Sequence, residues 1–218
     1  MFTIIRRSYE LFLQKLPLLL LFLLPLLLFE TADTAMDKDQ LSQVGVISAL
    51  VAIFLKVEIM LVIYTFLLDD KIRWGYAPLF MLKFLALDFV ISLIAAAPSL
   101  IIFHLLDVTF VDMAFPLWFY ESCLILTMLY TLWILPRLSL LYPRFIKGEK
   151  ISPKIWWQAT SDKNWRWLLA GVFICGPDLF SRFWNYNTYV EIVWSNLVLL
   201  LPVCFSVVYF KKNREEEK

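Results

Sequence analysis

Six apolar runs of about twenty residues constrain this chain more than any other feature. They cover residues 11–29, 44–68, 84–106, 113–136, 167–185 and 190–210. A helix of that length crosses the hydrocarbon core of a bilayer, and it bonds all of its own backbone groups. The sequence therefore predicts an all-α, polytopic membrane protein, a six-transmembrane-helix bundle that forms a single integral membrane domain over residues 1–218.

The composition agrees with this class, because 61% of the residues are hydrophobic, 18% are charged and the mean hydropathy is +0.73. The formal net charge is only +1, which predicts no general attraction to nucleic acid. The first run follows a basic start, as in a signal peptide. However, Glu30 and Asp33 stand at the third position before the candidate cleavage points after Ala32 and Ala35. A permanent first helix is therefore expected.

The positions of Lys and Arg predict the orientation, because cationic loops resist translocation. One set of loops and termini contains fifteen such residues, whereas the opposite set contains only Lys38 and Arg182. This asymmetry places both termini in the cytoplasm and the chain in the cytoplasmic (inner) membrane as a multi-pass protein.

The longest polar segment, 137–166, predicts a cytoplasmic interfacial helix at about 152–161. Ser152 and Pro153 are typical of a helix start, and the tryptophans that follow suit the headgroup layer. The segment is either a plain anchor or a surface for anionic headgroups. Its candidate contacts for lipid headgroups or a protein partner are Arg137, Arg144, Lys147, Lys150, Lys154, Trp156, Trp157, Lys163 and Arg166. The protein partner is either a second copy of the chain or another membrane protein.

Six charged residues of the apolar runs are expected at membrane depth: Lys56, Glu58, Asp88, Glu121, Asp178 and Arg182. A charge at the bilayer centre costs about 2.5 to 3.5 kcal/mol, so these side chains are expected to face other helices as a buried polar cluster. Lys56 and Glu58 point to different sides of one helix and cannot easily pair. Asp88, Glu121 and Asp178 are alternative partners for Lys56. The cluster is interpreted either as a structural network or as a path for a proton, ion or substrate.

The sequence predicts neither an enzyme nor a cofactor. His104 is the single histidine, so no site that needs two imidazoles can form, and no metal is expected. Cys123, Cys175 and Cys204 lie in separate runs, which gives no CxxC motif. Phosphate-binding, hydrolase and zinc-protease motifs are also lacking in the sequence.

Residues 71–91 and 154–174 repeat each other weakly, with Lys-Ile-x-Trp at the start of both segments. Such an echo is typical of a duplicated hairpin, which would make 71–82 an interfacial segment as well.

The segment 130–175 resembles the YciC-like bacterial inner-membrane proteins and the membrane domain attached to some glycerophosphodiester phosphodiesterases. The residues that carry the resemblance are Arg137, Pro143, Ala159, Ser161, Arg166 and Trp167. The resemblance implies about six helices with a short surface helix before re-entry, and it implies no catalytic residue. The function expected is an accessory or envelope component that contacts anionic lipid or a protein partner through the basic loop. The alternative is a small transporter or channel subunit that uses Lys56, Glu58, Asp88, Glu121 and Asp178.

Overall fold

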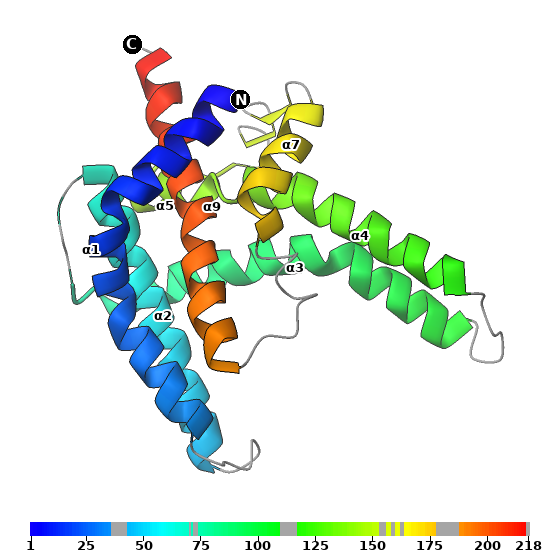
Figure 1. Cartoon of the computed structure of the whole chain (residues 1–218), viewed down its shortest axis with the longest axis horizontal. Coiled ribbons are helices and arrows are strands. Elements are labelled where there is room, and N and C mark those ends of the chain that lie inside the picture. Colours follow the sequence, from blue (N-terminus) through cyan, green and yellow to red (C-terminus); the bar gives the residue numbers. More distant parts are fainter. Residues whose placement is uncertain are drawn as a thin grey trace.

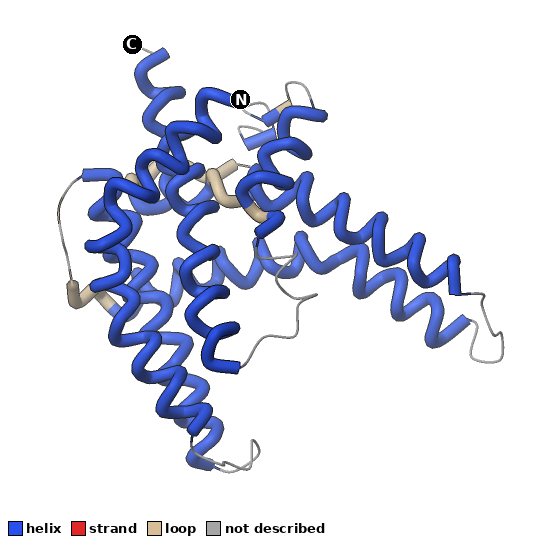
Figure 2. Tube along the Cα trace, in the orientation of Figure 1, coloured by secondary structure: helices blue, strands red, loops and turns tan. Residues whose placement is uncertain are grey.

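The computed structural model describes residues 1–35, 43–69, 71, 74–109, 117–152, 156–157, 160–161, 164–177 and 188–216. Over these residues the chain is built of helices and short turns, without a strand (Figure 2). The helices are α1 (Phe2–Ala35), α2 (Gln43–Asp69), α3 (Pro78–Thr109), α4 (Leu117–Leu138), α5 (Leu141–Ile146), α7 (Asn164–Ile174) and α9 (Thr188–Glu216). The predicted all-α class is therefore confirmed.

Five helices in the described residues are long and apolar enough to cross a membrane. Their candidate spans are Phe2–Ala32, Val46–Asp69, Pro78–Ile102, Trp118–Ile146 and Val190–Glu215. This finding supports a multi-pass membrane protein. The α1 and α3 helices begin well before the predicted starts at 11 and 84, because a helix continues past the point where the chain leaves the apolar layer.

The predicted run 167–185 is only partly described. The α7 helix covers eleven residues, which at 1.5 Å per residue is about 16 Å, roughly half of the hydrocarbon thickness. Residues 178–187 lie outside the described part. In the predicted interfacial helix, Trp156, Trp157 and Thr160 are helical, whereas 153–155 and 158–159 are not described.

The long helices form two antiparallel units. The α1 helix packs against both α2 and α9, and the two termini lie at the same end of this group (Figure 1). The α3 and α4 helices form a hairpin that points away from it (Figure 1). The α7 helix packs on α4, where the buried residues Ala170 and Gly171 allow a close approach.

The core follows these contacts. One apolar cluster joins α1, α2 and α9 through residues such as Leu23, Ile59 and Cys204. A second joins the start of α1 to α4, α7 and α9 around Trp167 and Phe205, whose ring centroids are 6.4 Å apart. Many other large apolar side chains lie on the outside of the helices. This distribution is expected where lipid, and not water, covers the surface.

Candidate functional site

A chamber of about 560 Å³ lies between α2, α3 and α9. The ends of α4 and α7 and the start of α5 complete its wall. Its lining residues are Ile53, Lys56, Val57, Met60, Tyr64, Phe84, Leu85, Asp88, Ile91, Ser92, Leu135, Ser139, Tyr142, Cys175, Val198, Leu199, Pro202 and Val203. Most of these side chains are apolar, and the few polar groups converge from different helices. A mostly apolar cavity of this size with a few polar groups is the usual form of a small-molecule site.

Lys56 and Asp88 are the two charged residues of the chamber, and both were expected in the polar cluster. Lys56 is an exposed side chain in the middle of α2, and over the described residues it makes no ion pair or hydrogen bond. Asp88 accepts a hydrogen bond from the Tyr142 hydroxyl. The anion in the chamber therefore has a partner, whereas the cation has none in the part of the chain that is described.

Aromatic residues that the sequence did not single out build one wall of the chamber. The ring of Tyr142 lies 5.6 Å from that of Tyr64 and 5.3 Å from that of Phe84. Tyr64 is buried, and its hydroxyl accepts a 3.4 Å hydrogen bond from Ser206. These contacts join α2, α3, α5 and α9. No local pattern marks such residues, because aromatic side chains are common on every apolar helix of this chain.

The other members of the predicted cluster lie elsewhere. The Oε1 atom of Glu58 accepts a 2.6 Å hydrogen bond from the backbone N–H of Gly75. Its Oε2 atom is buried and has no partner among the described residues. Glu121 is exposed near the start of α4, while Asp178 and Arg182 lie outside the described residues. Among the described members of the predicted cluster, Lys56 and Asp88 line one chamber, whereas Glu58 and Glu121 do not line it.

Arg137 also differs from the expected surface contact, because its side chain is 0% exposed. The guanidinium carbon lies 4.1 Å from the ring centre of Trp133, 5.5 Å from that of Trp167 and 5.8 Å from that of Trp157. These three rings are called the Arg137 cage. Aromatic faces attract a cation, and the weakly hydrated guanidinium tolerates the loss of water.

Hydrogen bonds also hold Arg137 in the cage. Its Nη2 atom donates to Asn164 Oδ1 over 2.6 Å, and its carbonyl oxygen accepts from the Trp156 indole over 2.9 Å. The Nε and Nη1 atoms have no hydrogen-bond partner in the described part of the chain. Arg137 therefore joins the end of α4 to the start of α7, which is a structural role.

The remaining predicted basic contacts are divided between paired and unpaired side chains. Lys147 forms an ion pair with Asp69, and Glu149 accepts from Arg214, with its Oε1 atom 3.1 Å from Nε. Arg144 and Lys150 make no ion pair within the described segments. Lys154 and Lys163 fall outside these segments.

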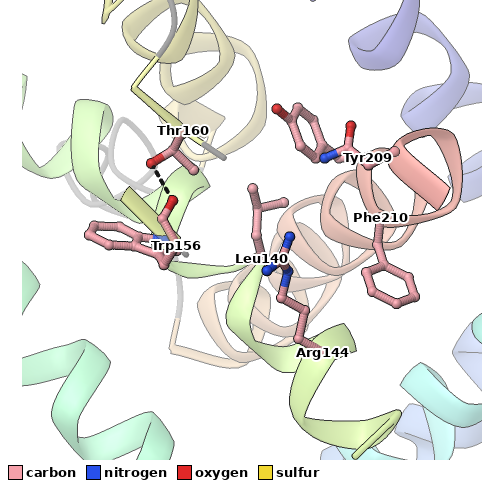
Figure 3. Close-up of a pocket in the computed structure, with 7 residues that line it drawn as sticks. Leu140, Arg144, Trp156, Thr160, Tyr209 and Phe210 are labelled. Carbon is pink, nitrogen blue, oxygen red and sulfur yellow. Dashed lines mark hydrogen bonds between the residues drawn. The ribbon is translucent and has the colours of Figure 1, made fainter. Parts of the chain in front are cut away.

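Arg144 points into a small pocket near the end of α9 (Figure 3). Trp156 and Thr160 form one side, Tyr209 and Phe210 form the other, and Leu140 lies between them (Figure 3). The Thr160 hydroxyl donates a 3.0 Å hydrogen bond to the Trp156 carbonyl. The pocket volume of about 10 Å³ is enough for at most one water molecule.

Arg166 lies at the same end of the molecule, with its guanidinium carbon 5.8 Å from the ring centre of Trp165. Burial, followed by the nearby charges of Arg166 and Lys212, lowers the pKa of the Met1 amine below its ordinary value. The pKa direction follows because a cation is less stable when it is buried or lies near other cations. The starts of α1 and α7 and the end of α9 therefore bring positive charges together.

No group of three His, Cys, Asp or Glu side chains that could hold a metal ion is found among the described residues. Cys123, Cys175 and Cys204 form no disulfide in the described part of the chain. Comparison with protein-family models, with curated proteins and with solved structures finds no match to this chain.

Proposed function

We propose that this chain is an accessory component of the cytoplasmic membrane whose cytoplasmic end binds anionic lipid headgroups. In this proposal the chain crosses the membrane six times, both termini are cytoplasmic, and the segment around 152–161 lies in the headgroup layer. The resemblance of residues 130–175 to the YciC-like proteins fits the same role.

The observation that carries the proposal is a group of cations gathered from four helices around the two termini. Arg7, Arg144, Arg166 and Lys211 come from α1, α5, α7 and α9 and make no ion pair within the described part of the chain. Arg144 lines a pocket with Tyr209 and Phe210 near the end of α9, and Arg166 lies near the Met1 amine. Each cation near an anionic leaflet contributes about 1 kcal/mol of attraction. Mutual repulsion between these charges would be relieved by phosphate groups of lipids.

Exposed tryptophans support a position of this segment at the level of the lipid headgroups. Trp157 is 51% exposed and Trp165 is 58% exposed, and both lie in the segment that also contains Arg166. Tryptophan side chains concentrate at the level of the headgroups, where the ring meets hydrocarbon and the N–H meets water. Cations next to such rings are placed to meet lipid phosphates.

The experiment compares the full-length protein in nanodiscs of phosphatidylcholine with increasing fractions of phosphatidylglycerol. Lipids retained by the released protein are counted by native mass spectrometry at low and high salt. We expect retention of phosphatidylglycerol to fall with salt. The double variant Arg144→Gln/Arg166→Gln should retain less of it.

The matched control is Arg6→Gln/Arg214→Gln, which removes two cations that already have partners in Glu10 and Glu149. It should retain nearly as much phosphatidylglycerol as the unaltered protein. Equal loss in both double variants would show that only net charge matters. Retention that does not depend on salt or on any of these residues would reject the proposal.

A second candidate function is passage of a small molecule across the membrane, and the chamber that contains Lys56 and Asp88 favours it. Flux in proteoliposomes is compared for the unaltered protein, Lys56→Gln and Asp88→Asn. Loss of substrate-driven flux in both variants would support transport. Flux that is the same in all three proteins would remove this candidate.

A further inference from the structure

One charged group of the chamber, the Lys56 ammonium, has no hydrogen-bond or ion-pair partner among the described residues. Lys56 lies at the middle of α2, about 20 Å along the helix from either end. A cation at that depth is costly unless it meets an opposite charge or water. Asp88 lines the same chamber but already accepts from Tyr142, and it forms no ion pair with Lys56. The group that fits beside Lys56 is therefore an anion.

The rest of the wall determines what the anion is attached to. Met60, Ile91, Leu135, Val198 and Leu199 present hydrocarbon from four different helices. An apolar wall favours a ligand that has hydrocarbon along most of its length, because burial of each methylene group contributes about 0.8 kcal/mol.

The volume of the chamber is sufficient for a single hydrocarbon chain. At roughly 30 Å³ for each water-sized group, a chamber of about 560 Å³ holds about nineteen such groups. A carboxylate with a chain of about sixteen carbons has about eighteen nonhydrogen atoms, so it fits at this packing. A diacyl lipid needs about twice the space.

We infer that the chamber binds a single-chain amphiphile with an anionic head, a long-chain carboxylate, whose head pairs with Lys56. This site is separate from the cytoplasmic cations, and binding there requires neither headgroup recognition nor transport. The hydrocarbon chain lies between α3 and α9. The Asp88 carboxylate in the wall accepts a hydrogen bond from Tyr142.

The test measures equilibrium binding of palmitate to the full-length protein in phosphatidylcholine nanodiscs, with hexadecanol as the uncharged analogue of the same chain. The unaltered protein should bind palmitate about tenfold or more tightly than hexadecanol, because only the carboxylate forms an ion pair with the Lys56 ammonium. Lys56→Gln should remove this preference. The matched control is Lys83→Gln, which removes an exposed lysine of α3 that does not line the chamber.

Two further variants test where the hydrocarbon chain of the ligand lies and how the charge at position 88 affects its affinity. Ser92 lines the chamber as a small side chain, so Ser92→Trp should weaken the binding of both palmitate and hexadecanol by filling the space. Asp88→Asn should strengthen the binding of palmitate, because a negative charge near the carboxylate is removed. Thermal unfolding of each variant shows whether it is folded, and only folded variants are compared.

Three results would overturn the inference. The first is equal affinity of the unaltered protein for palmitate and hexadecanol. The second is unchanged binding in both Lys56→Gln and Ser92→Trp, since the ligand would then lie elsewhere. The third is complete displacement of palmitate by added phosphatidylglycerol, which would show that a diacyl lipid occupies the chamber. The Arg144→Gln/Arg166→Gln variant should bind palmitate normally even if headgroup binding fails.

Discussion

Gly171 of α7 lies directly against the backbone of Leu132 of α4. A Cβ atom built on Gly171 would fall 1.7 Å from the Leu132 carbonyl oxygen and 2.5 Å from its carbonyl carbon. No side-chain rotation at residue 132 can relieve this overlap, because the atoms belong to the main chain. The two helices therefore depend on the absence of a side chain at one position.

Gly171→Ala should destabilise the protein by at least about 1 to 3 kcal/mol, because α7 must move away from α4. The measurement is the unfolding midpoint in detergent, with Val172→Ala at the exposed neighbouring position as the control. A Gly171→Ala midpoint equal to that of the control would mean that α7 does not pack on α4 at this distance.

The Arg137 cage predicts how three arginine substitutions rank in their cost to the stability of the protein. Arg137→Lys keeps the charge but loses the flat face that contacts the rings, so it should cost roughly 2 kcal/mol. Arg137→Met should cost less than Arg137→Lys, because it leaves no buried charge among Trp133, Trp157 and Trp167. Arg144→Lys, at a half-buried arginine, should change the unfolding midpoint little. The reverse order for the first two would show that charge, and not shape, holds the cage.

The hydrogen bond between Tyr142 and Asp88 should be measurable as a coupling energy. Tyr142→Phe and Asp88→Leu each remove one partner, and we expect a coupling of about 1 to 2 kcal/mol in a double-mutant cycle of unfolding free energies. Tyr130→Phe, which removes a hydroxyl that donates to the Ile94 carbonyl in α3, serves as the control. Additive effects of the first pair would show that the two groups do not interact in the membrane.

Glu58 should fix the turn at Gly75. Gln at position 58 keeps an oxygen that can accept from the Gly75 N–H, whereas Leu does not, so Glu58→Leu should loosen the turn and Glu58→Gln should not. Gly75 has a φ of 74°, so Gly75→Ala should also be destabilising, by about 1 kcal/mol. Trypsin cleavage after Lys71 provides the readout. Equal cleavage rates for Glu58→Leu and Glu58→Gln would contradict this account.

Hydropathy predicts which parts of the chain lie in the apolar layer, and it succeeded best where a helix ends at the edge of that layer. For α2 the predicted run 44–68 matches the helix Gln43–Asp69 closely. The match is poorer for α1, which begins at Phe2 and continues through Pro17 and Pro25. A polar stretch that stays helical gives no apolar signal, so its boundary is missed.

The side-chain partners were harder to predict, because they depend on contacts between distant segments. Tyr142 and Asp88 are 54 residues apart, and nothing local connects them. Arg137 was expected on the surface because it lies at the end of an apolar run. One local signal was present: Trp133 lies one helical turn before Arg137, a spacing that places the ring beside the cation.

The Arg137 cage has a consequence for the order in which the chain assembles in the bilayer. Trp133 lies on the same helix as the guanidinium, but Trp167 and the Asn164 amide arrive only with α7. Until then, water at the membrane surface must solvate this charge. Docking of α7 is thus a dehydration step, and we expect it to follow insertion of α4 and to complete the fold at the end of the molecule where both termini lie.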